Sequence, residues 1–392
     1  MHTNTYVLIF LTSLTLTVTE NVPEDAKLLV PQLIRKYGYP CEAHRVVTED
    51  GYVLTVHRIP PRSGGNKGPV LLQHGLLLSS ADWIVAGPQK ALGYILADAG
   101  YDVWLGNSRG STYSRHHTRL SPNGKEFWDF SWHEIGVYDM PAIIDHILSQ
   151  TSRTNLYYVG HSQGTTAFYV MCSEKPEYNR KIKLQISLAP SAYMNHITSP
   201  LILKLIKLTF PLDKLTSLIG EFEFLPSSTF KALIGKLFCS DGILSQTLCS
   251  NILFSIFGYN EQQMNATLVP IIAGHSPAGA SVKQLLHFAQ LIKSGKFRQY
   301  DEGELKNVFK YGSSVPPSYH IENITSPVYL YKSRNDWLSN EIDVNRLRRR
   351  LLNVKGEILI GDPQFNHIDY LYAINAPTLV YNLILSHLRE YP

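Results

Sequence analysis

Short apolar runs alternate with helix-like patterns along the first half of the chain. The apolar runs have the length and composition of buried strands, and they lie at 53–58, 70–73, 102–105, 156–159 and 182–188. Helical patterns fall between them, at 94–99 and 165–172. Continuous apolar runs are typical of parallel strands that are covered on both faces. The alternation therefore predicts an α/β fold with a mostly parallel central sheet flanked by helices.

The rhythm changes after Pro190. From about 191 to 310, helical patterns dominate and strand candidates are few. One amphipathic stripe has apolar residues at helical spacing; it consists of Phe230, Leu233, Ile234, Leu237 and Phe238. Strand patterns return at 327–332 and 357–360, and a last helix is expected over about 368–388. We therefore expect a helical insertion within an α/β core.

The strongest candidate chemistry is the pentapeptide Gly160-His161-Ser162-Gln163-Gly164. It matches G-x-S-x-G, and it follows a predicted strand and opens a predicted helix, which is the setting of the nucleophile in α/β-hydrolases. The small residues two positions before and after the serine allow a tight turn that exposes the hydroxyl. Ser162 is therefore the candidate nucleophile. A similar segment at Gly274–Gly279 has one residue too many and no preceding strand, and we reject it.

A serine hydroxyl needs a base, and that base needs an orienting acid. In α/β-hydrolases the chain order is serine, acid, histidine. Asp336 follows the strand pattern at 327–332, and His367 follows the one at 357–360. Loops at the carboxyl ends of strands are where α/β folds build their sites. We therefore predict a Ser162, Asp336 and His367 triad; the competing acids are Asp343, Asp362 and Asp369.

The oxyanion of an ester-hydrolysis transition state needs two hydrogen-bond donors. One is expected to be the backbone N–H of Gln163, directly after the nucleophile. The other is expected from His74-Gly75-Leu76, which follows an early strand, with the Leu76 N–H as donor. Arg109, in a loop after the strand at 102–105, is predicted to pair with a carboxylate, and Asp139 is predicted to cap the helix that follows it.

Composition excludes several other classes of function. The formal charge of +4 is small for 392 residues, and the densest basic cluster, near 346–350, is better explained by a solvated helix face than by nucleic-acid binding. No spacing of Cys or His suggests a metal site, and no cofactor is implied.

The chain has four cysteines. Cys239 and Cys249 flank a turn-like segment and favour a disulfide, whereas Cys41 and Cys172 are expected to be buried free thiols.

The N-terminus is typical of an export signal. An apolar stretch from Tyr6 to Val18 is too short to span a membrane, and Thr17 and Thr19 suit cleavage before Glu20. Asn265 and Asn323 each begin an N-glycosylation sequon. These features predict a protein of the secretory pathway, either secreted or lysosomal, without a transmembrane segment.

Several of these motifs together resemble the acid lipase family, which includes gastric and lysosomal acid lipases. The similarity runs from about Pro31 to the C-terminus. It rests on Gly38-Tyr39-Pro40, Thr48–Tyr52, His74-Gly75-Leu76, Gly106–Gly110, Gly160–Gly164, Pro277–Ser281 and Asn366-His367 with Asp369. Two positions depart from the family pattern, because Phe257 stands where some relatives carry a cysteine and Ser111 where relatives often have Asn.

The resemblance implies an α/β-hydrolase core with a helical cap and lid. With the bounds that the chain pattern gives, we expect a signal peptide at 1–19, a core at 20–190 and 311–392, and the cap and lid at 191–310. It implies a serine lipase that hydrolyses triacylglycerols or cholesteryl esters at a lipid–water interface. It also implies the same triad and oxyanion donors, and a Cys239–Cys249 bridge one residue longer than the family spacing. Two alternatives remain open: a carboxylesterase for small soluble esters, and a lipid-binding protein without catalysis.

Overall fold

The computed structural model describes residues 22–62, 65, 67–209, 222–224 and 253–392. Three sequence-based expectations lie outside these residues and stay predictions. They are the signal peptide at 1–19, the amphipathic stripe at 230–238 and the Cys239–Cys249 disulfide.

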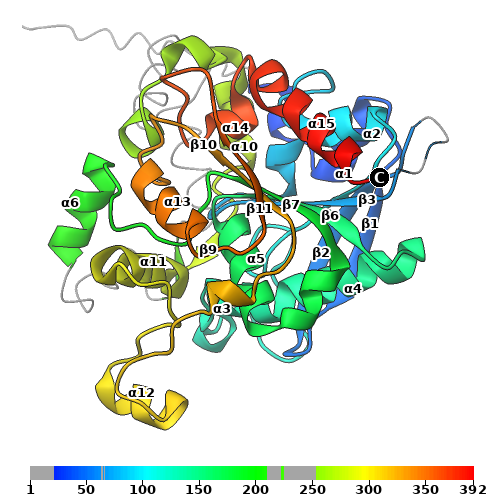
Figure 1. Ribbon diagram of the computed structural model, residues 1–392. Coiled ribbons are helices and arrows are strands. Elements are labelled where there is room, and N and C mark those ends of the chain that lie inside the picture. The colour runs from blue at the N-terminus through cyan, green and yellow to red at the C-terminus, as the bar shows by residue number, and fades with distance from the viewer. Residues whose placement is uncertain (1–21, 63–64, 66, 210–221, 225–252) are drawn as a thin grey trace, which may run out of the picture.

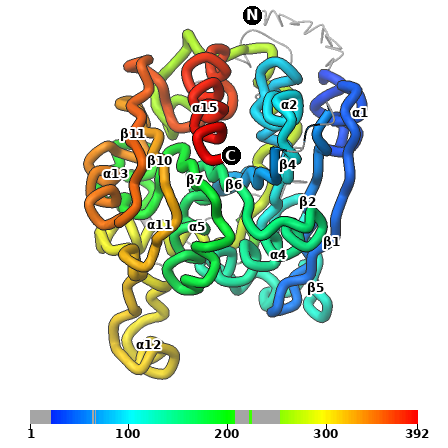
Figure 2. The backbone as a smooth tube through the Cα atoms, turned by 45° about the vertical axis from the view of Figure 1, so that its right-hand side comes forward, coloured from blue at the N-terminus to red at the C-terminus, as the bar shows by residue number. Residues whose placement is uncertain are grey.

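A twisted sheet runs through the centre of the molecule (Figures 1 and 2). Within the described residues it has nine strands in the order β1-β2-β4-β3-β6-β7-β10-β11, with β5 paired to β2. The bounds are β1 Glu42–Val47, β2 Tyr52–Ile59, β3 Pro69–Gln73, β4 Asp102–Leu105, β5 His116–His117, β6 Leu156–His161, β7 Ile182–Leu188, β10 Val328–Lys332 and β11 Val354–Leu359. Pairing is antiparallel around β2 and parallel from β4 to β11. The prediction of a mostly parallel sheet is confirmed.

Helices cover both faces of the sheet (Figure 1). Their bounds are α1 Val30–Lys36, α2 Leu92–Asp98, α3 Trp132–Glu134, α4 Met140–Thr151, α5 Gln163–Glu174, α6 Pro200–Thr209, α10 Val269–His275, α11 Val282–Ser294, α12 Glu304–Tyr311, α13 Glu341–Arg348, α14 Asp369–Tyr372 and α15 Asn382–Glu390. One apolar core contains residues of α1, α2 and α15, and a second contains residues of α4, α5 and α13.

Alternation along β3 explains why there are two cores. Successive side chains of a strand point to opposite faces of its sheet. Val70 and Leu72 accordingly belong to the core under α2 and α15, and Leu71 belongs to the core under α4 and α5. All three side chains are fully buried, and each such burial stabilises the fold by about 1.5–3 kcal/mol.

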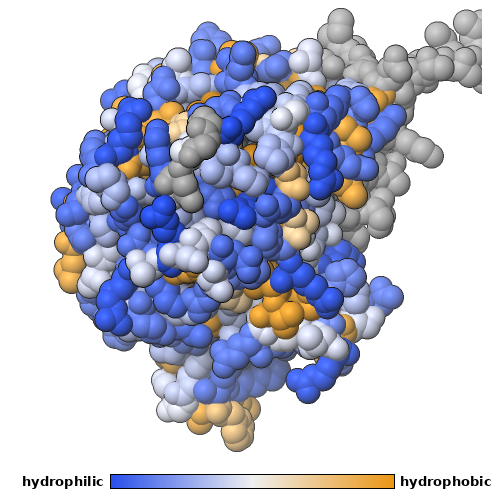
Figure 3. Space-filling model, turned by 90° about the vertical axis from the view of Figure 1, so that its right-hand side faces the viewer, coloured by the Kyte–Doolittle hydropathy of each residue, from blue (hydrophilic) through white to orange (hydrophobic). Residues whose placement is uncertain are grey.

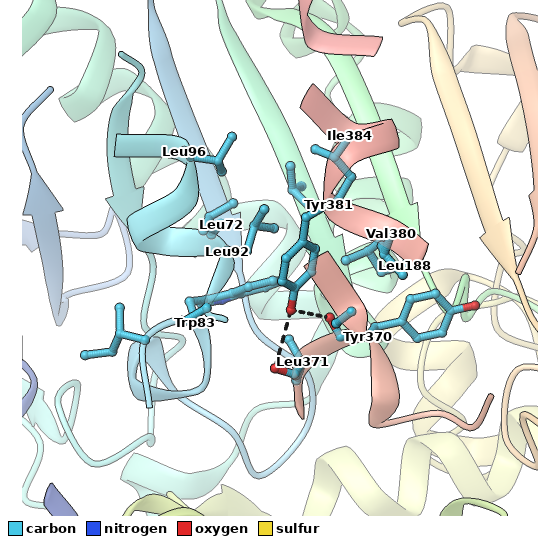
Figure 4. Packing of buried hydrophobic residues seen from close by; sticks show 14 of the residues in the cluster. Leu72, Trp83, Leu92, Leu96, Leu188, Tyr370, Leu371, Val380, Tyr381 and Ile384 are labelled. Carbon is cyan, nitrogen blue, oxygen red and sulfur yellow. Dashed lines mark hydrogen bonds between the residues drawn. The ribbon is translucent and has the colours of Figure 1, made fainter. Parts of the chain in front are cut away.

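The C-terminal segment packs on the sheet beside Trp83, as Figure 4 shows. Tyr381 lies among apolar side chains that include Leu72 and Leu188, and its hydroxyl donates to the backbone carbonyl of Tyr370 at 2.8 Å. Tyr370 belongs to α14, which begins two residues after His367. The core thus fixes the loop that carries the candidate base.

The prediction of one helix over 368–388 is wrong. The segment forms α14, a break, a π-helical turn at Pro377–Tyr381, and α15. Proline restricts the residue before it and lacks an N–H, so a helix ends ahead of it and a new one begins at it. Pro377 stands at the start of the second helical stretch.

The prediction that Asp139 caps a helix is also wrong. α4 begins directly after Asp139, but the Asp139 side chain makes no capping bond. Its carboxylate instead accepts from the Arg109 backbone N–H at 2.9 Å and from Arg109 Nε at 2.7 Å. The Asp139 carboxylate binds Arg109 rather than the N–H groups at the start of α4, because hydrogen bonds from a charged guanidinium are stronger than those from neutral amides.

Between β7 and β10 the described residues are mostly helical, with two short strands, β8 Glu223–Phe224 and β9 Ala280–Ser281. α12 extends below the body in Figures 1 and 2, and Figure 3 shows apolar side chains at this lower end. Leu305 and Phe309 of α12 are 81% and 91% exposed. None of the helices in the described part of the chain is long and apolar enough to cross a membrane.

Candidate active site

The candidate nucleophile lies on a sharp turn between β6 and α5. Ser162 has φ of 51° and ψ of −120°, a conformation that L-residues rarely adopt. Such a conformation costs about 1–3 kcal/mol and is found where function requires it. The turn leaves the serine half-buried and places its hydroxyl at the carboxyl end of β6.

Close backbone contact explains the glycine two residues after the serine. A Cβ on Gly164 would lie 2.3 Å from the carbonyl oxygen of Gln73, at the end of β3. Any side chain there would push α5 away from the sheet. The small residue required by the G-x-S-x-G pattern is therefore a packing requirement between α5 and β3.

His367 lies against Ser162, the candidate nucleophile, although the two are 205 positions apart. His367 Nε2 is 2.8 Å from Ser162 Oγ, and His367 Nδ1 is 2.9 Å from both carboxylate oxygens of Asp336. The side chains of His367 and Asp336 are 3% and 1% exposed. An imidazole held between a hydroxyl and a carboxylate can take the hydroxyl proton while the carboxylate stabilises the resulting cation.

The Asp336 loop presents its carboxylate to the histidine. Oδ1 accepts from the backbone N–H groups of Leu338 at 2.9 Å and Ser339 at 2.7 Å. Ser339 Oγ donates in turn to the carbonyl of Pro190 at 2.7 Å. These bonds fix the loop after β10 to the chain that follows β7, and they leave both carboxylate oxygens within reach of His367.

The three competing acids have other partners. Asp343 lies in α13 and pairs with His196 at 2.8 Å. Asp362 accepts from Gln263 Nε2 at 3.0 Å, and Asp369 accepts from Asn260 Nδ2 at 2.7 Å. The structure therefore brings Asp336, rather than any of these three, to the imidazole.

The predicted oxyanion donors belong to two segments next to Ser162, the start of α5 and the loop after β3. Gln163 is the first residue of α5, where a backbone N–H has no partner inside the helix. Leu76 follows Gly75, at which a Cβ would lie 3.1 Å from the Ser162 Cβ. Among the described residues, neither the Gln163 N–H nor the Leu76 N–H has an acceptor. Both amides are thus available near the hydroxyl.

His74 holds the Leu76 loop to the loop after β4. Its Nδ1 donates to the Gly75 carbonyl at 2.7 Å, and its Nε2 accepts from the Ser108 N–H at 3.0 Å. Burial lowers the pKa of His74 and keeps the ring neutral, as an accepting Nε2 requires. This histidine, which the sequence places in the expected oxyanion segment His74-Gly75-Leu76 without a role of its own, orders the loop that carries a candidate oxyanion donor.

Sequence reasoning gave His161 no role. His161 Nε2 donates to the backbone carbonyl of His367 at 2.8 Å, and burial lowers the pKa of His161 to about 3. The residue occupies the first variable position of G-x-S-x-G, where no pattern signals a function.

Arg109 is paired as predicted, with Asp139 and with Asp50 at 2.6 and 2.9 Å.

The remaining predicted sites lie away from the nucleophile. Asn265 and Asn323 are exposed, as glycan acceptors must be. Cys172 is a buried free thiol, but Cys41 is only half-buried, which corrects the expectation for that residue. Ser276 of the rejected motif donates to Asp82 at 2.9 Å. Within the described residues, no cluster of His, Cys, Asp and Glu could hold a metal ion.

Comparison with known proteins agrees with this geometry. The model of the alpha/beta hydrolase fold matches residues 68–373, and a partial alpha/beta-hydrolase lipase region matches residues 30–87. The human lysosomal acid lipase/cholesteryl ester hydrolase is 41% identical over 376 residues, which cover 94% of this chain and 93% of that protein. This chain belongs to the acid lipase family of α/β-hydrolases. Membership confirms the predicted family, fold and enzyme class, a carboxylic ester hydrolase.

Two other relatives are about as similar. Lipase 1 of Drosophila melanogaster is 44% identical, with 95% of this chain and 82% of that protein covered. Gastric triacylglycerol lipase of Rattus norvegicus is 40% identical, with 93% of each covered. A solved structure of a soluble variant of monoglyceride lipase from Saccharomyces cerevisiae aligns with a TM-score of 0.55 at 15% identity, over 91% of this chain and 98% of that one. At that identity the likeness concerns the fold alone.

Proposed function

We propose that this chain hydrolyses neutral lipid esters, either triacylglycerols or cholesteryl esters, through an acyl-enzyme on Ser162. The observation that carries the proposal is the continuous hydrogen-bonded series from Ser162 Oγ through His367 to Asp336. The lipid substrate class follows from the relatives, which include a lysosomal acid lipase/cholesteryl ester hydrolase and a gastric triacylglycerol lipase.

The first half of the reaction forms the acyl-enzyme. Ser162 Oγ attacks the ester carbonyl carbon while His367 Nε2 takes the hydroxyl proton, and Asp336 stabilises the imidazolium. The carbonyl oxygen becomes an oxyanion that accepts from the Leu76 and Gln163 N–H groups, and the positive end of α5 stabilises its charge. The C–O bond to the alcohol then breaks, and His367 returns the proton to the leaving oxygen.

The second half releases the acid. Water attacks the acyl carbonyl while its proton passes to His367 Nε2, and the same oxyanion donors act again. Collapse of this intermediate breaks the bond to Ser162 Oγ, which recovers the proton from His367. The products are one alcohol and one fatty acid, and the enzyme returns to its starting state without any cofactor.

We propose that residues 191–310 cap this site. Three contacts support the assignment. The Ala278 N–H donates to the Leu77 carbonyl at 2.7 Å, beside the Leu76 loop. Gln284 Nε2 donates to the Gln163 side chain at 3.1 Å, and the Phe257 ring stacks over the His367 ring at 5.7 Å between centroids. A cap held by these contacts, with the Phe257 ring over His367, would exclude water from the acyl-enzyme.

The test is an assay of purified protein on emulsified long-chain triacylglycerol, on a cholesteryl ester and on a soluble short-chain ester, from acid to neutral pH. Emulsion activity that Ser162→Ala abolishes supports a lipase. Activity on the soluble ester alone overturns the lipid substrate and leaves a carboxylesterase. Folded protein without activity on any of them overturns catalysis and leaves a lipid-binding role.

We further propose passage through the secretory pathway, with a secreted or lysosomal destination. The exposed sequons at Asn265 and Asn323 support it, as do the lysosomal and gastric relatives. Expression in an animal cell tests the proposal. We expect a mature N-terminus at Glu20, and a glycosidase-sensitive mass that Asn265→Gln with Asn323→Gln removes. An uncleaved, unglycosylated chain in the cytoplasm would overturn it.

A further inference from the structure

A four-residue segment of the insertion, residues 257–260, passes between the loops that carry Asp336 and His367. Its consecutive backbone carbonyls accept hydrogen bonds from both loops. The Phe257 carbonyl accepts from the N–H groups of Trp337 and His367, each at 3.4 Å. The next two carbonyls have side-chain donors: Gly258 O accepts from Asn366 Nδ2 at 2.9 Å, and Tyr259 O accepts from Asn335 Nδ2 at 2.8 Å.

The fit at Gly258 shows how closely this segment lies against the Asp336 loop. Gly258 has φ of +114°, and a Cβ there would lie 2.3 Å from the Asn335 carbonyl oxygen. Neither the conformation nor the space admits another residue. The two loops are also joined directly, because Asn335 Nδ2 donates to the Gln364 carbonyl at 2.8 Å. Displacement of residues 257–260 would therefore change the distance between Asp336 and His367.

Asn260 ends the segment in a fully buried pair. Its Nδ2 donates to Asp369 Oδ2 at 2.7 Å, and the same carboxyl oxygen accepts from the Asn366 N–H at 2.7 Å. Asn260 Oδ1 is buried without a partner among the described residues. A buried acceptor without a donor is destabilising, so the Asn260 amide lacks one hydrogen bond that its surroundings must supply.

We propose that residues 257–260 are a positioning strap for Asp336 and His367, closed by a pair between the Asn260 amide and the protonated carboxyl of Asp369. A carboxylic acid facing an amide accepts at one oxygen and donates from the other. Protonated Asp369 therefore accepts from Asn260 Nδ2 and donates to Asn260 Oδ1, which satisfies both ends of the amide. An ionised carboxyl has no proton to donate, and it leaves Asn260 Oδ1 orphaned.

The electrostatics of the pocket favour the protonated form. Burial raises the pKa of Asp369 to about 7, and the nearby carboxyls of Asp362 and Asp336 act in the same direction. The hydrogen bonds from Asn366 and Asn260 oppose the rise. Tyr370, the next residue, is buried and is held neutral by a pKa well above its usual value. The strap is thus closed in acid and weakened as pH rises through about 7.

The direction in which stability changes with pH follows from proton linkage. A carboxyl whose folded pKa lies above its unfolded value of about 3.9 binds more protons in the folded state. Its contribution to stability is then greatest below pH 4 and is lost progressively up to about pH 7. The strap is a positioning device, and its catalytic consequence rests on the proposed function, because it acts through His367 and Asp336.

The decisive variant is Asp369→Asn, which imitates the protonated carboxyl with one acceptor and one fixed donor. We expect it to keep at least half of the wild-type kcat in acid. We also expect it to remove two declines that the wild type shows with rising pH: the fall of Tm between about pH 4 and pH 7, and the fall of kcat as pH rises through about 7. Asn260→Leu removes the pair, and we expect kcat to fall about tenfold with KM within twofold, since the substrate site is untouched.

Asp362→Asn is the matched control. Asp362 and Gln263 form a neighbouring carboxyl–amide pair at 3.0 Å that is partly exposed. This variant should keep the decline of kcat and of Tm with rising pH, and the decline should move to slightly lower pH. Asp362 is one of the anions that raise the pKa of Asp369, and the variant removes it. A decline that persists unchanged in Asp369→Asn would overturn the strap, and so would wild-type kcat in Asn260→Leu.

Two readouts separate the strap from the proposed function. The pH dependence of Tm requires no substrate, so it tests the Asp369 pair even if the wild type hydrolyses no ester. A flattened Tm profile in Asp369→Asn with an inactive wild type would support the strap and overturn the lipase. If the wild type is active and Asp369→Asn has the same pH profiles of kcat and Tm, the result would support the lipase and overturn the strap. If Asn260→Leu does not fold, Asn260→Ser provides the kcat comparison.

Discussion

The imidazole of His161, at the end of β6, donates from Nε2 to the backbone carbonyl of His367, in the loop between β11 and α14, at 2.8 Å, although the two residues are 206 positions apart. The residue directly before the proposed nucleophile, Ser162, therefore holds the main chain of the proposed base. Burial lowers the pKa of His161 to about 3, so the ring is neutral at any pH well above 3. Donation from Nε2 then requires the tautomer with its proton on Nε2, and no positive charge forms beside His367.

Replacement of His161 by Leu should lower kcat about tenfold, because the base loses one anchor and small displacements of a reacting group are costly. KM should change little. His161→Gln keeps a donor on a flexible chain and should recover part of the loss. The comparison of kcat for the two variants, with circular dichroism to establish folding, is the measurement. Equal kcat for wild type and His161→Leu would remove the anchoring role.

Asp336→Asn should reduce kcat by about 10⁴-fold, because the amide favours the wrong tautomer of the histidine and cannot stabilise its cation. Asp362→Asn provides the control on a nearby acid that does not contact His367, and its kcat should stay within a few-fold of wild type in acid. Initial rates on one ester at saturating substrate decide the matter. A large loss in Asp362→Asn with little in Asp336→Asn would reassign the acid.

Arg109→Met should destabilise the fold by about 3 kcal/mol or more at neutral pH, because it leaves the buried Asp139 carboxylate without its cation. The pKa of Asp139 is already raised to about 6 by burial, so the loss should shrink in acid, where the carboxyl is neutral. Arg350→Ala removes an exposed pair with Glu322 and should cost at most about 1 kcal/mol. Urea unfolding at pH 5 and pH 7 measures both; equal losses would contradict the account.

The central sheet could be predicted because its strands are short apolar runs separated by helical patterns. β4 and β7 have the predicted bounds, and the other predicted strands differ by a few residues at their ends. β1 was missed: its burial pattern is mostly exposed, and Glu42, His44 and Arg45 dilute the apolar signal. Such a strand is defined by its pairing with β2, which no local pattern reveals.

The candidate triad could be located because each member follows a strand that the pattern identifies. The chemistry around it could not. Asn260 and Asp369 are 109 positions apart, and the asparagine lies in a part of the chain whose pattern indicates only apolar helices. Asp139 looked like a helix cap because the sequence does not show that Arg109 lies beside it. Long-range polar pairs of this kind depend on the packed fold rather than on local propensity.

The central claim is that Ser162 is the nucleophile, and covalent labelling tests it most directly. Purified protein is mixed with p-nitrophenyl diethyl phosphate, release of p-nitrophenolate is followed, and the labelled peptide is identified by mass spectrometry. We predict about one p-nitrophenolate per chain, with the diethylphosphoryl group on Ser162, and no labelling of Ser162→Ala. Label on another residue, or ester hydrolysis that persists in Ser162→Ala, would contradict the account.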